Sequence, residues 1–340
     1  MSLRIGLIGA GTNTKLRHIP GFQKIRGVEV VAVCNRSRES SQRVADEFKI
    51  PRVFTDWKEL VHSRDVDAVC IGTWPYLHCP AVLESLAAGK HVLTEARMAM
   101  DAAEARQMHA AAQKSAKVAM VVPAPLWLES EPLLLARVRA GFFGDLLEIH
   151  VRGLGGQYQP DAPLHWRQRR DLSGLNIMTA GILNETVRRY AGHDRQVRAG
   201  SALFTPQRID PATGQKRTVD VPESLGVISR LESGATAVYH VSSVARFGET
   251  SLEVYGTKGT FKLSGDQCLV AGAGDSALKP LEIPASARGG WRVEEEFVEA
   301  ILQGTPVTRT SFADGVKYME FTEAVNVSLR EGRAVDLPRV

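Results

Sequence analysis

The sequence lacks any hydrophobic run long enough to cross a membrane. None of its apolar stretches approaches the roughly 20 residues that a spanning helix needs. The first residues, MSLRIGLIGAG, lead into a glycine-rich turn and contain no small-residue cleavage site of the secretory kind. We therefore expect a cytoplasmic protein that has no membrane partner.

Cysteine is scarce, and its spacing does not suggest metal binding. There are four cysteines, and they form no Cys-x-x-Cys pair and no Cys/His spacing typical of zinc. They are Cys34, Cys70, Cys79 and Cys268. The pattern predicts buried free thiols and no metal site.

The sequence also has no block of one charge. Its 42 Lys and Arg residues are interleaved with 38 Asp and Glu residues, which leaves a net charge of +4. The densest basic run, HWRQRRD at 165–171, is short and contains one aromatic residue. Such a run favours a phosphate or carboxylate ligand over nucleic acid, and we expect no nucleic-acid partner.

The composition is that of an ordinary globular protein, and 340 residues suit two domains. Over residues 1–123, apolar β-rich runs alternate with helical patterns, which is typical of an α/β domain with a doubly wound parallel sheet. The five runs are RIGLIG, VEVVAVC, DAVCIG, HVLTE and KVAMVV. We predict a dinucleotide-binding Rossmann domain over this range.

The order of the expected elements is different over residues 124–340. From 196 to about 271 strand follows strand without helices between them, which predicts an α+β domain with a large open mixed or antiparallel sheet. Helices are expected near 128–140, before Gly192, near 291–303, and between Ser311 and Gly332. A broad sheet without evident covering helices favours a homodimer or homotetramer.

The clearest chemical signal is the glycine turn after the first strand. Gly9 permits a tight turn, and Gly11 lets the backbone approach a pyrophosphate at a helix N-terminus. Thr12 and Asn13 lie in the same turn and are candidate cofactor contacts. Thr14 occupies the place of the usual third glycine, which normally allows close packing of helix on strand.

The end of the second strand bears on the choice of cofactor. An acidic residue there would bind the adenosine ribose and repel a 2′-phosphate, but the sequence has Asn35, Arg36, Ser37 and Arg38. Asn35 keeps a ribose contact without the charge, and the two arginines are suited to a 2′-phosphate. NADP is favoured, and NAD stays open because loop arginines are often simply solvated.

Three further residues follow the strand that ends at Ile71. Thr73 and Trp74 stand at its carboxyl end, where open α/β sheets bind ligands. His78 falls early in the next helix. We treat all three as candidate cofactor contacts, with core packing for Trp74 and a surface position for His78 as alternatives.

Six segments, in chain order, carry a family likeness over nearly the whole chain: Gly9-Ala10-Gly11, VEVVAVCNRS, VDAVCIGTWPYLH, ESLAAGKHVLTEA, HWRQRRDLSG and EVYGTKGTFKL. Together they resemble the glucose-fructose oxidoreductase / inositol 2-dehydrogenase / MocA (Gfo/Idh/MocA) family. The resemblance implies hydride transfer between a nicotinamide and a sugar, polyol or related carbonyl compound. It also implies a C-terminal sheet that often forms the oligomer interface.

The family's catalytic signatures are altered in this chain. Where the family has Glu-Lys-Pro after the fifth strand, this sequence has Glu95, Ala96 and Arg97, so the lysine is absent. In the second signature, Met178 takes the place of an Asp and Ile182 that of a His. Neither replacement titrates, so the proton that leaves an alcohol during oxidation needs another acceptor.

Other side chains are the candidates to supply what is missing. The catalytic candidates are Arg97, His165 and Glu185; the resemblance adds Glu95, Trp166 and Arg167 as cofactor contacts; the substrate candidates are Tyr158, Asn176 and Asn184. For Glu185 the competing interpretation is a structural ion pair with Arg188 or Arg189. His165 and Tyr158 have loop and rim positions as alternatives.

Three functions therefore stand beside one another. The leading one is an NAD(P)-dependent oxidoreductase acting on a sugar or polyol-like small molecule. The second is a regulatory or sensor protein that binds the dinucleotide without turnover, which the missing lysine favours. The third is a glycosidase-like lyase that uses bound NAD as a transient oxidant.

Overall fold

The computed structural model describes residues 2–265 and 267–337, and the chain forms two compact units. The first unit runs up to Pro123 and also contains Arg292–Met319. The second unit contains Ala124–Trp291 and the chain from Glu320 onward. The boundary at 123/124 lies where the alternation of strand and helix patterns in the sequence ends. The segment 292–319, which we expected in the second domain, instead packs its helical apolar face into the first.

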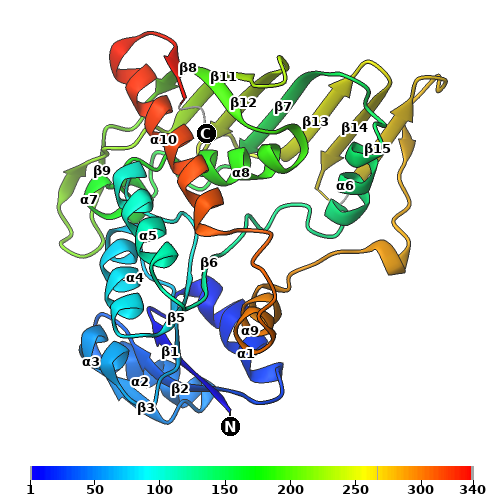
Figure 1. Ribbon diagram of the computed structural model, residues 1–340. Coiled ribbons are helices and arrows are strands. Elements are labelled where there is room, and N and C mark those ends of the chain that lie inside the picture. The colour runs from blue at the N-terminus through cyan, green and yellow to red at the C-terminus, as the bar shows by residue number, and fades with distance from the viewer. Residues whose placement is uncertain (1, 266, 338–340) are drawn as a thin grey trace. The chain divides into compact units, whose positions relative to one another are not determined.

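The first unit is built on a six-stranded parallel sheet with the order β3-β2-β1-β4-β5-β6 (Figure 1). Its strands are β1 (Leu3–Ile8), β2 (Val28–Cys34), β3 (Arg52–Phe54), β4 (Ala68–Ile71), β5 (His91–Thr94) and β6 (Ala119–Val121). This is the predicted doubly wound sheet. The short strand β3 was not predicted, because three partly exposed residues carry no apolar run.

Helices cover both faces of this sheet. The helices α4 and α5 pack against each other on one face, and α1 and α9 do so on the other (Figure 1). The helices of this unit are α1 (Ile19–Lys24), α2 (Arg38–Phe48), α3 (Trp57–His62), α4 (His78–Ala87), α5 (Ala102–Gln113) and α9 (Val293–Gln303). Asp101 caps α5 by accepting a hydrogen bond from the Glu104 amide at 2.9 Å.

The second unit contains a nine-stranded mixed sheet with the order β16-β15-β14-β13-β7-β12-β11-β8-β17. Only the β12–β7 pair is parallel among the described pairs. The strands are β7 (Leu146–Leu154), β8 (Asp194–Ala202), β11 (Ser224–Leu231), β12 (Thr236–Ser242), β13 (Thr250–Gly256), β14 (Gly259–Ser264), β15 (Gln267–Gly272), β16 (Lys279–Pro280) and β17 (Val335–Asp336). The predicted α+β domain with a mixed sheet is confirmed.

Helices cover one face of this sheet. They are α6 (Glu131–Arg139), α8 (Ala180–Ala191) and the C-terminal part of α10 (Phe312–Glu331), and their apolar side chains form one core with the inward residues of the strands. Along β11 buried and exposed residues alternate, so its other face points away from that core. A short helix α7 (Arg170–Ser173) and a small hairpin, β9 (Gln207–Ile209) with β10 (Lys216–Thr218), complete the unit.

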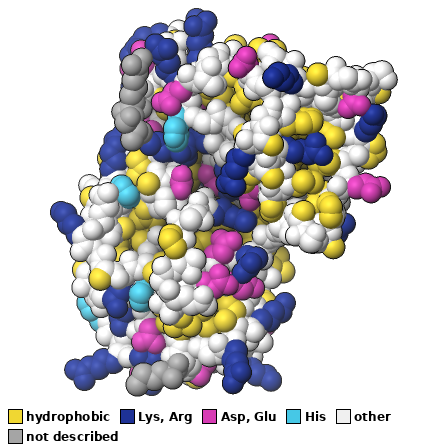
Figure 2. Space-filling model, turned by 45° about the vertical axis from the view of Figure 1, so that its right-hand side comes forward, with side chains coloured by type: hydrophobic (Ala, Val, Ile, Leu, Met, Phe, Trp, Pro, Cys, Tyr) yellow, Lys and Arg dark blue, Asp and Glu magenta, His cyan; other side chains and the backbone are white. Residues whose placement is uncertain are grey.

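Two features bear on partners. In the described part of the chain, no helix combines the length and the apolar character needed to cross a membrane. On the face drawn in Figure 2, Lys and Arg side chains are interspersed with Asp and Glu side chains, without one large basic area. That distribution does not resemble a nucleic-acid footprint.

Candidate functional site

The glycine turn after β1 has the backbone geometry of a close-approach site. Gly9 has φ +83°, and a Cβ there would lie 2.9 Å from the Thr73 backbone nitrogen. A Cβ at Gly11 would meet only the Gly72 carbonyl oxygen, at 3.8 Å. Gly11 is therefore not required for packing within the chain, and its surroundings leave room for a ligand.

Thr14 packs closely although it is not the expected glycine. Its side chain is 1% exposed and lies against Gly72, where a Cβ would come 2.1 Å from the Thr14 hydroxyl oxygen. Close packing of helix on sheet is thus kept by a glycine on β4's carboxyl end instead of one on the helix. Residues Thr14–His18 form a π-helical turn that runs into α1, a feature often found at functional sites.

A pocket of about 530 Å³ lies beside this turn, at the carboxyl ends of β1 to β4. This edge is where open α/β sheets bind ligands. Its lining includes the predicted Gly9, Gly11, Asn35, Arg36, Thr73 and Trp74. It also includes Thr55, Asp56, Trp57 and Tyr76, which we had not predicted. Recognising β3, whose end carries Thr55 and Asp56, would have identified two of them.

Asn35 holds the glycine turn to the next helix. Its Oδ1 accepts a hydrogen bond from the Ala10 amide at 2.7 Å, and its Nδ2 donates to the Ser40 carbonyl at 3.0 Å. Ser37 caps α2 by accepting from the Ser40 amide at 3.2 Å. The carboxamide of Asn35 is therefore committed to the backbone. The lining at this end of the pocket contains one positive side chain, Arg36, and one negative side chain, Asp56, while Arg38, the first residue of α2, is exposed.

Trp74 and His78 differ in their surroundings. The Arg36 guanidinium lies over the Trp74 ring, 4.4 Å from its centroid, so the tryptophan forms part of the pocket wall. His78 is 1% exposed, with Nδ1 3.0 Å from the Arg97 carbonyl oxygen and Nε2 3.1 Å from that of Thr73. Burial lowers the pKa of His78. A neutral ring has one N–H, so it donates to only one of these two carbonyl oxygens. His78 lies between the chain after β4 and the chain after β5 and is not among the residues that line the pocket.

Glu95 directly follows β5, and its carboxylate has several partners. Oε1 lies 3.0 Å from His18 Nε2 and also accepts a hydrogen bond from Asn13 Nδ2. His18 Nδ1 lies 2.5 Å from Glu294 Oε1, on α9. The next peptide bond, between Ala96 and Arg97, is cis, and Arg97 is 4% exposed. Sequence reasoning missed His18 and Glu294.

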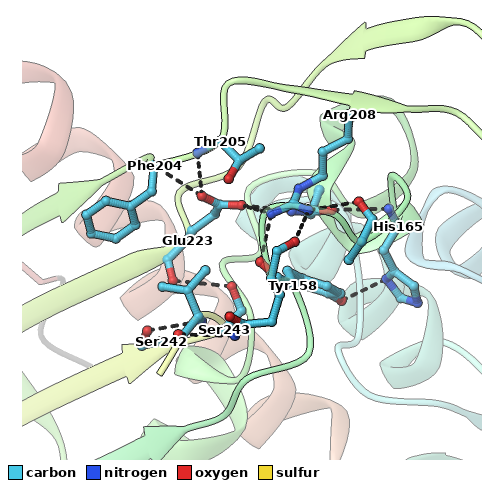
Figure 3. Close-up of polar contacts among 12 residues, drawn as sticks. Tyr158, His165, Phe204, Thr205, Arg208, Glu223, Ser242 and Ser243 are labelled. Carbon is cyan, nitrogen blue, oxygen red and sulfur yellow. Dashed lines mark hydrogen bonds and ion pairs between the residues drawn. The ribbon is translucent and has the colours of Figure 1, made fainter. Parts of the chain in front are cut away.

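In the second unit, the loop between β7 and α7 carries Tyr158 and His165 (Figure 3). The Tyr158 hydroxyl donates to His165 Nδ1 at 2.8 Å, and the Arg167 amide donates to the same nitrogen at 3.2 Å. Burial and the nearby Arg167 charge lower the pKa of His165 to about 4. His165 is thus neutral near pH 7, with its proton on Nε2, and it is a weak base. Arg167 lies over the Trp166 ring, 4.1 Å from its centroid.

A buried ion pair supports this loop (Figure 3). Arg208 on β9 pairs with Glu223 at 2.5 Å, and both side chains are nearly inaccessible to solvent. The same guanidinium donates to the carbonyl oxygens of Tyr158, Gln159 and Ala162 at 2.6 to 2.9 Å. The other Glu223 oxygen accepts from the amides of Phe204 and Thr205. The network fixes the backbone on which Tyr158 stands.

The remaining candidates on and before α8 are buried. Glu185 is 2% exposed, pairs with Arg189 and accepts a hydrogen bond from the Ala124 amide at 2.8 Å. Asn184 donates to Asp194 and Tyr239, and Asn176 donates to the Ser173 carbonyl. Met178 belongs to the hydrophobic core. Each of these side chains thus has partners within the second unit, and the Asn184 Oδ1 atom is buried without a hydrogen-bond partner among the described residues.

No group of three or more His, Cys, Asp or Glu side chains within 2–265 and 267–337 is arranged to hold a metal ion. The four cysteines are buried free thiols, as predicted. The first unit therefore has a strand-end pocket bordered by a glycine turn, and the second unit has a polar loop. A strand-end pocket with such a turn is typical of a dinucleotide-binding Rossmann domain.

The comparisons place the chain in one family. Residues 3–122 match the model described as oxidoreductase family, NAD-binding Rossmann fold, and residues 134–262 match the GFO/IDH/MocA C-terminal domain. The chain belongs to the GFO/IDH/MocA family. The predicted family and its NAD-binding, oxidoreductase character are confirmed.

Curated relatives carry the names of sugar enzymes. The 1,5-anhydro-D-fructose reductase of Ensifer adhaerens is 29% identical over 76% of this chain and 74% of its own. The levoglucosan dehydrogenase of Pseudarthrobacter phenanthrenivorans is 24% identical over 100% of this chain and 99% of its own. A solved structure of a levoglucosan dehydrogenase in complex with NADH has the same fold, with a TM-score of 0.89, 23% identity and full coverage of both chains.

Proposed function

We propose that this protein transfers a hydride between a nicotinamide dinucleotide and a sugar, polyol or related carbonyl compound. The observation that carries the proposal is the pocket at the carboxyl ends of β1 to β4, bordered by the Gly9–Gly11 turn and the Trp74 ring. The names of the relatives, a reductase and a dehydrogenase of anhydrosugars, support a carbohydrate-like substrate.

The residues between the end of β2 and the start of α2 favour NADP as the cofactor. No carboxylate stands at positions 35–38, and Asn35 is held by backbone partners. A 2′-phosphate would meet the exposed Arg36 and Arg38 together with the N-terminus of α2, an eleven-residue helix capped by Ser37. Guanidinium groups and free helix amides both favour a doubly charged phosphate.

For the substrate end we propose Tyr158 and His165 as contacts. With Nδ1 occupied, a neutral His165 offers its Nε2–H as a hydrogen-bond donor to a substrate oxygen. Arg97 remains a candidate for stabilising negative charge, because its guanidinium is permanently protonated. The ion pair of Glu185 with Arg189 supports a structural role for that carboxylate.

A second candidate function is dinucleotide binding without turnover. It is favoured by Ala96 at the place of the family's lysine and by the low pKa of His165, since neither provides a base near neutral pH. The two functions differ in one result. Both predict that the protein binds NADP⁺ more tightly than NAD⁺ in a calorimetric titration, but only the first predicts reduction of bound cofactor by a sugar or polyol.

We further propose that the protein is a homo-oligomer that uses the uncovered face of the nine-stranded sheet. One row across this face, from β8 to β14, consists of Arg198, Ile228, Val238, His150, Glu253 and Lys262. Ile228 and Val238, at its centre, are 57% and 37% exposed. An apolar centre with charged edges is typical of protein interfaces.

A further inference from the structure

Three ionisable side chains from distant parts of the sequence meet inside the first unit. His18 at the end of the π-helical turn is 0% exposed, and Glu294 on α9 is 1% exposed. Glu95 after β5 retains 15% of its side-chain surface. The distances of 2.5 Å from His18 Nδ1 to Glu294 and 3.0 Å from His18 Nε2 to Glu95 make a continuous carboxylate–imidazole–carboxylate chain.

The geometry requires a particular protonation state. An ionised carboxylate accepts hydrogen bonds and donates none, so each of the two contacts needs a proton on the ring nitrogen. Neutral histidine has only one such proton, whereas imidazolium has two. With both carboxylates ionised, the two contacts are therefore made at once only when His18 is charged.

The charges around His18 favour that state. Burial by itself lowers the pKa of His18, but the hydrogen bonds and charges of Glu294 and Glu95 outweigh it and raise the pKa to about 9. Of the other titratable groups that act on the two carboxylates, Cys70 on β4 has a pKa raised well above its usual value by burial, and His78 has a lowered one. Both are uncharged at neutral pH.

The backbone makes room for this arrangement. A Cβ at Gly21, in α1, would come within 2.7 Å of the carboxyl group of Glu294. A larger residue at position 21 would therefore displace the Glu294 carboxyl group from its present place. Glu294 also lies in the first turn of α9, where a negative charge is favoured by the helix dipole.

The carboxylate–imidazole–carboxylate chain ends, at Glu95, next to the glycine turn that borders the pocket. Asn13, two residues after Gly11, donates to Glu95 Oε1, so the glycine turn and the carboxylate are directly linked. Glu95 Oε2 has a 3.2 Å contact with the amide of Ala96. Burial raises the pKa of Glu95, but the hydrogen bonds from His18 and Asn13 lower it overall, so the group is ionised.

We propose that His18 and Glu294 are positioning residues that hold Glu95 as an ionised hydrogen-bond acceptor for the bound dinucleotide. Ala96 places no cation beside Glu95, and His18 supplies one from the interior of the unit. The inference rests on the proposed function, because it requires that the protein bind a dinucleotide. Loss of the proton from His18 would leave two carboxylates facing an uncharged ring and would release Glu95 from its position.

The test is the pH dependence of NADP⁺ affinity, measured by calorimetry from about pH 7 to about pH 10. This range lies above the ionisation of a 2′-phosphate near 6. Wild-type affinity should stay constant to about pH 8 and fall at least about threefold above about pH 9, where His18 loses its proton. In Glu294→Gln, one carboxylate is gone, and the fall should begin at least about one pH unit lower.

The matched control is Glu84→Gln, which alters the exposed His62–Glu84 pair of the same unit. Its profile should coincide with that of the wild type. A Glu294→Gln profile that also coincides with that of the wild type would overturn the inference. If the melting temperature of Glu294→Gln fell while the pH at which affinity falls did not move, the role of Glu294 would be purely structural.

A second measurement separates failure of the inference from failure of the proposed function. Histidine NMR of the wild-type protein without cofactor should show His18 protonated up to about pH 9. If His18 instead titrates near 6.5, the proposed positioning role of His18 is wrong whether or not a dinucleotide binds. If His18 titrates near 9 but NADP⁺ and NAD⁺ do not bind at any pH, the proposed function fails and the positioning role fails with it.

Discussion

At the scale of single residues, the close packing between the first helix and the sheet depends on Thr14 and Gly72. A glycine is usual at position 14 of this turn, but here position 14 carries a side chain and the glycine lies opposite it, at position 72. Thr14 is buried on the helix side, and its hydroxyl donates to the Gly9 carbonyl at 3.3 Å. Gly72 leaves the space that Thr14 fills. Gly72 is therefore required for packing, whereas Gly11 is not, and we propose that the dinucleotide approaches the chain at Gly11.

This separation predicts opposite behaviour of two alanine variants. Gly72→Ala would drive a Cβ into Thr14 and the Gly9 backbone and should destabilise the first unit by about 1–3 kcal/mol. Gly11→Ala meets nothing closer than 3.8 Å, so its stability should change by no more than about 0.5 kcal/mol, while NADP⁺ affinity falls at least about tenfold. Denaturant unfolding and calorimetry measure the two quantities. Unchanged affinity in Gly11→Ala would mean that the dinucleotide does not approach this turn.

Single residues also show what the sequence can and cannot predict. Gly9, Gly11 and Trp74 were predicted at the pocket from spacing alone, because strand ends and tight turns leave local signals. The His18–Glu294 contact joins residues 276 positions apart, and neither has a local pattern that distinguishes it from a surface residue. Asn35 was predicted to reach a ribose, yet its partners are backbone groups whose approach depends on how the turn folds.

At the scale of elements, the loop between β7 and α7 depends on a hairpin far along the chain. Arg208 on β9 reaches three carbonyl oxygens of residues 158–162, and Glu223 anchors its charge. The sequence offered Tyr158 as a substrate candidate and His165 as a catalytic candidate, and the two side chains are in contact. Its support was not predictable, since Arg208 lies about 50 residues from the carbonyl groups that it binds.

We predict that Arg208→Lys loosens this loop. A lysine has one ammonium group in place of a planar fork, so it cannot serve three carbonyl groups and Glu223 together, and the second unit should lose about 1–3 kcal/mol of stability. Hydrogen exchange of the amides at 158–162 should accelerate at least about tenfold, and KM for the substrate should rise. NADP⁺ affinity should stay unchanged, because the pocket residues belong to the first unit.

The control for this variant is Arg246→Ala. Arg246 is an exposed arginine that touches the same loop through the Gln159 side chain at 2.7 Å. Removing an exposed contact of this kind should change neither exchange nor stability measurably. Equal exchange rates in Arg208→Lys and the wild type would show that the ion pair does not hold the loop.

At the scale of the whole molecule, the sequence predicted two domains and both sheets, but it did not show which core each helix joins. The helix near 291–303 was assigned to the second domain by its position in the chain, whereas α9 packs on α1 in the first unit. An amphipathic pattern predicts that one face of a helix is buried, but it does not predict which core that face joins. The uncovered face of the nine-stranded sheet is the feature with consequences for assembly.

We predict an oligomer that depends on this face. Placing a charge at the apolar centre of the row with Ile228→Lys should convert the assembly into monomers, because a lysine cannot be buried there without a partner. Light scattering coupled to gel filtration gives the mass directly. The control is Leu302→Lys, which changes a 60% exposed leucine on α9 and should leave the mass unchanged. A monomeric wild type, or an unchanged mass in Ile228→Lys, would contradict the proposed interface.

We propose that this member of the family, with Ala96 at the lysine position, still transfers hydride. The direct measurement is the absorbance of reduced nicotinamide when purified protein is incubated with NADP⁺ or NAD⁺ and a panel of sugars, anhydrosugars and polyols. We expect at least one of them to reduce the cofactor, faster with NADP⁺, and Gly11→Ala to weaken the signal. Tight dinucleotide binding with no change in absorbance across the whole panel would contradict it and leave a binding protein without turnover.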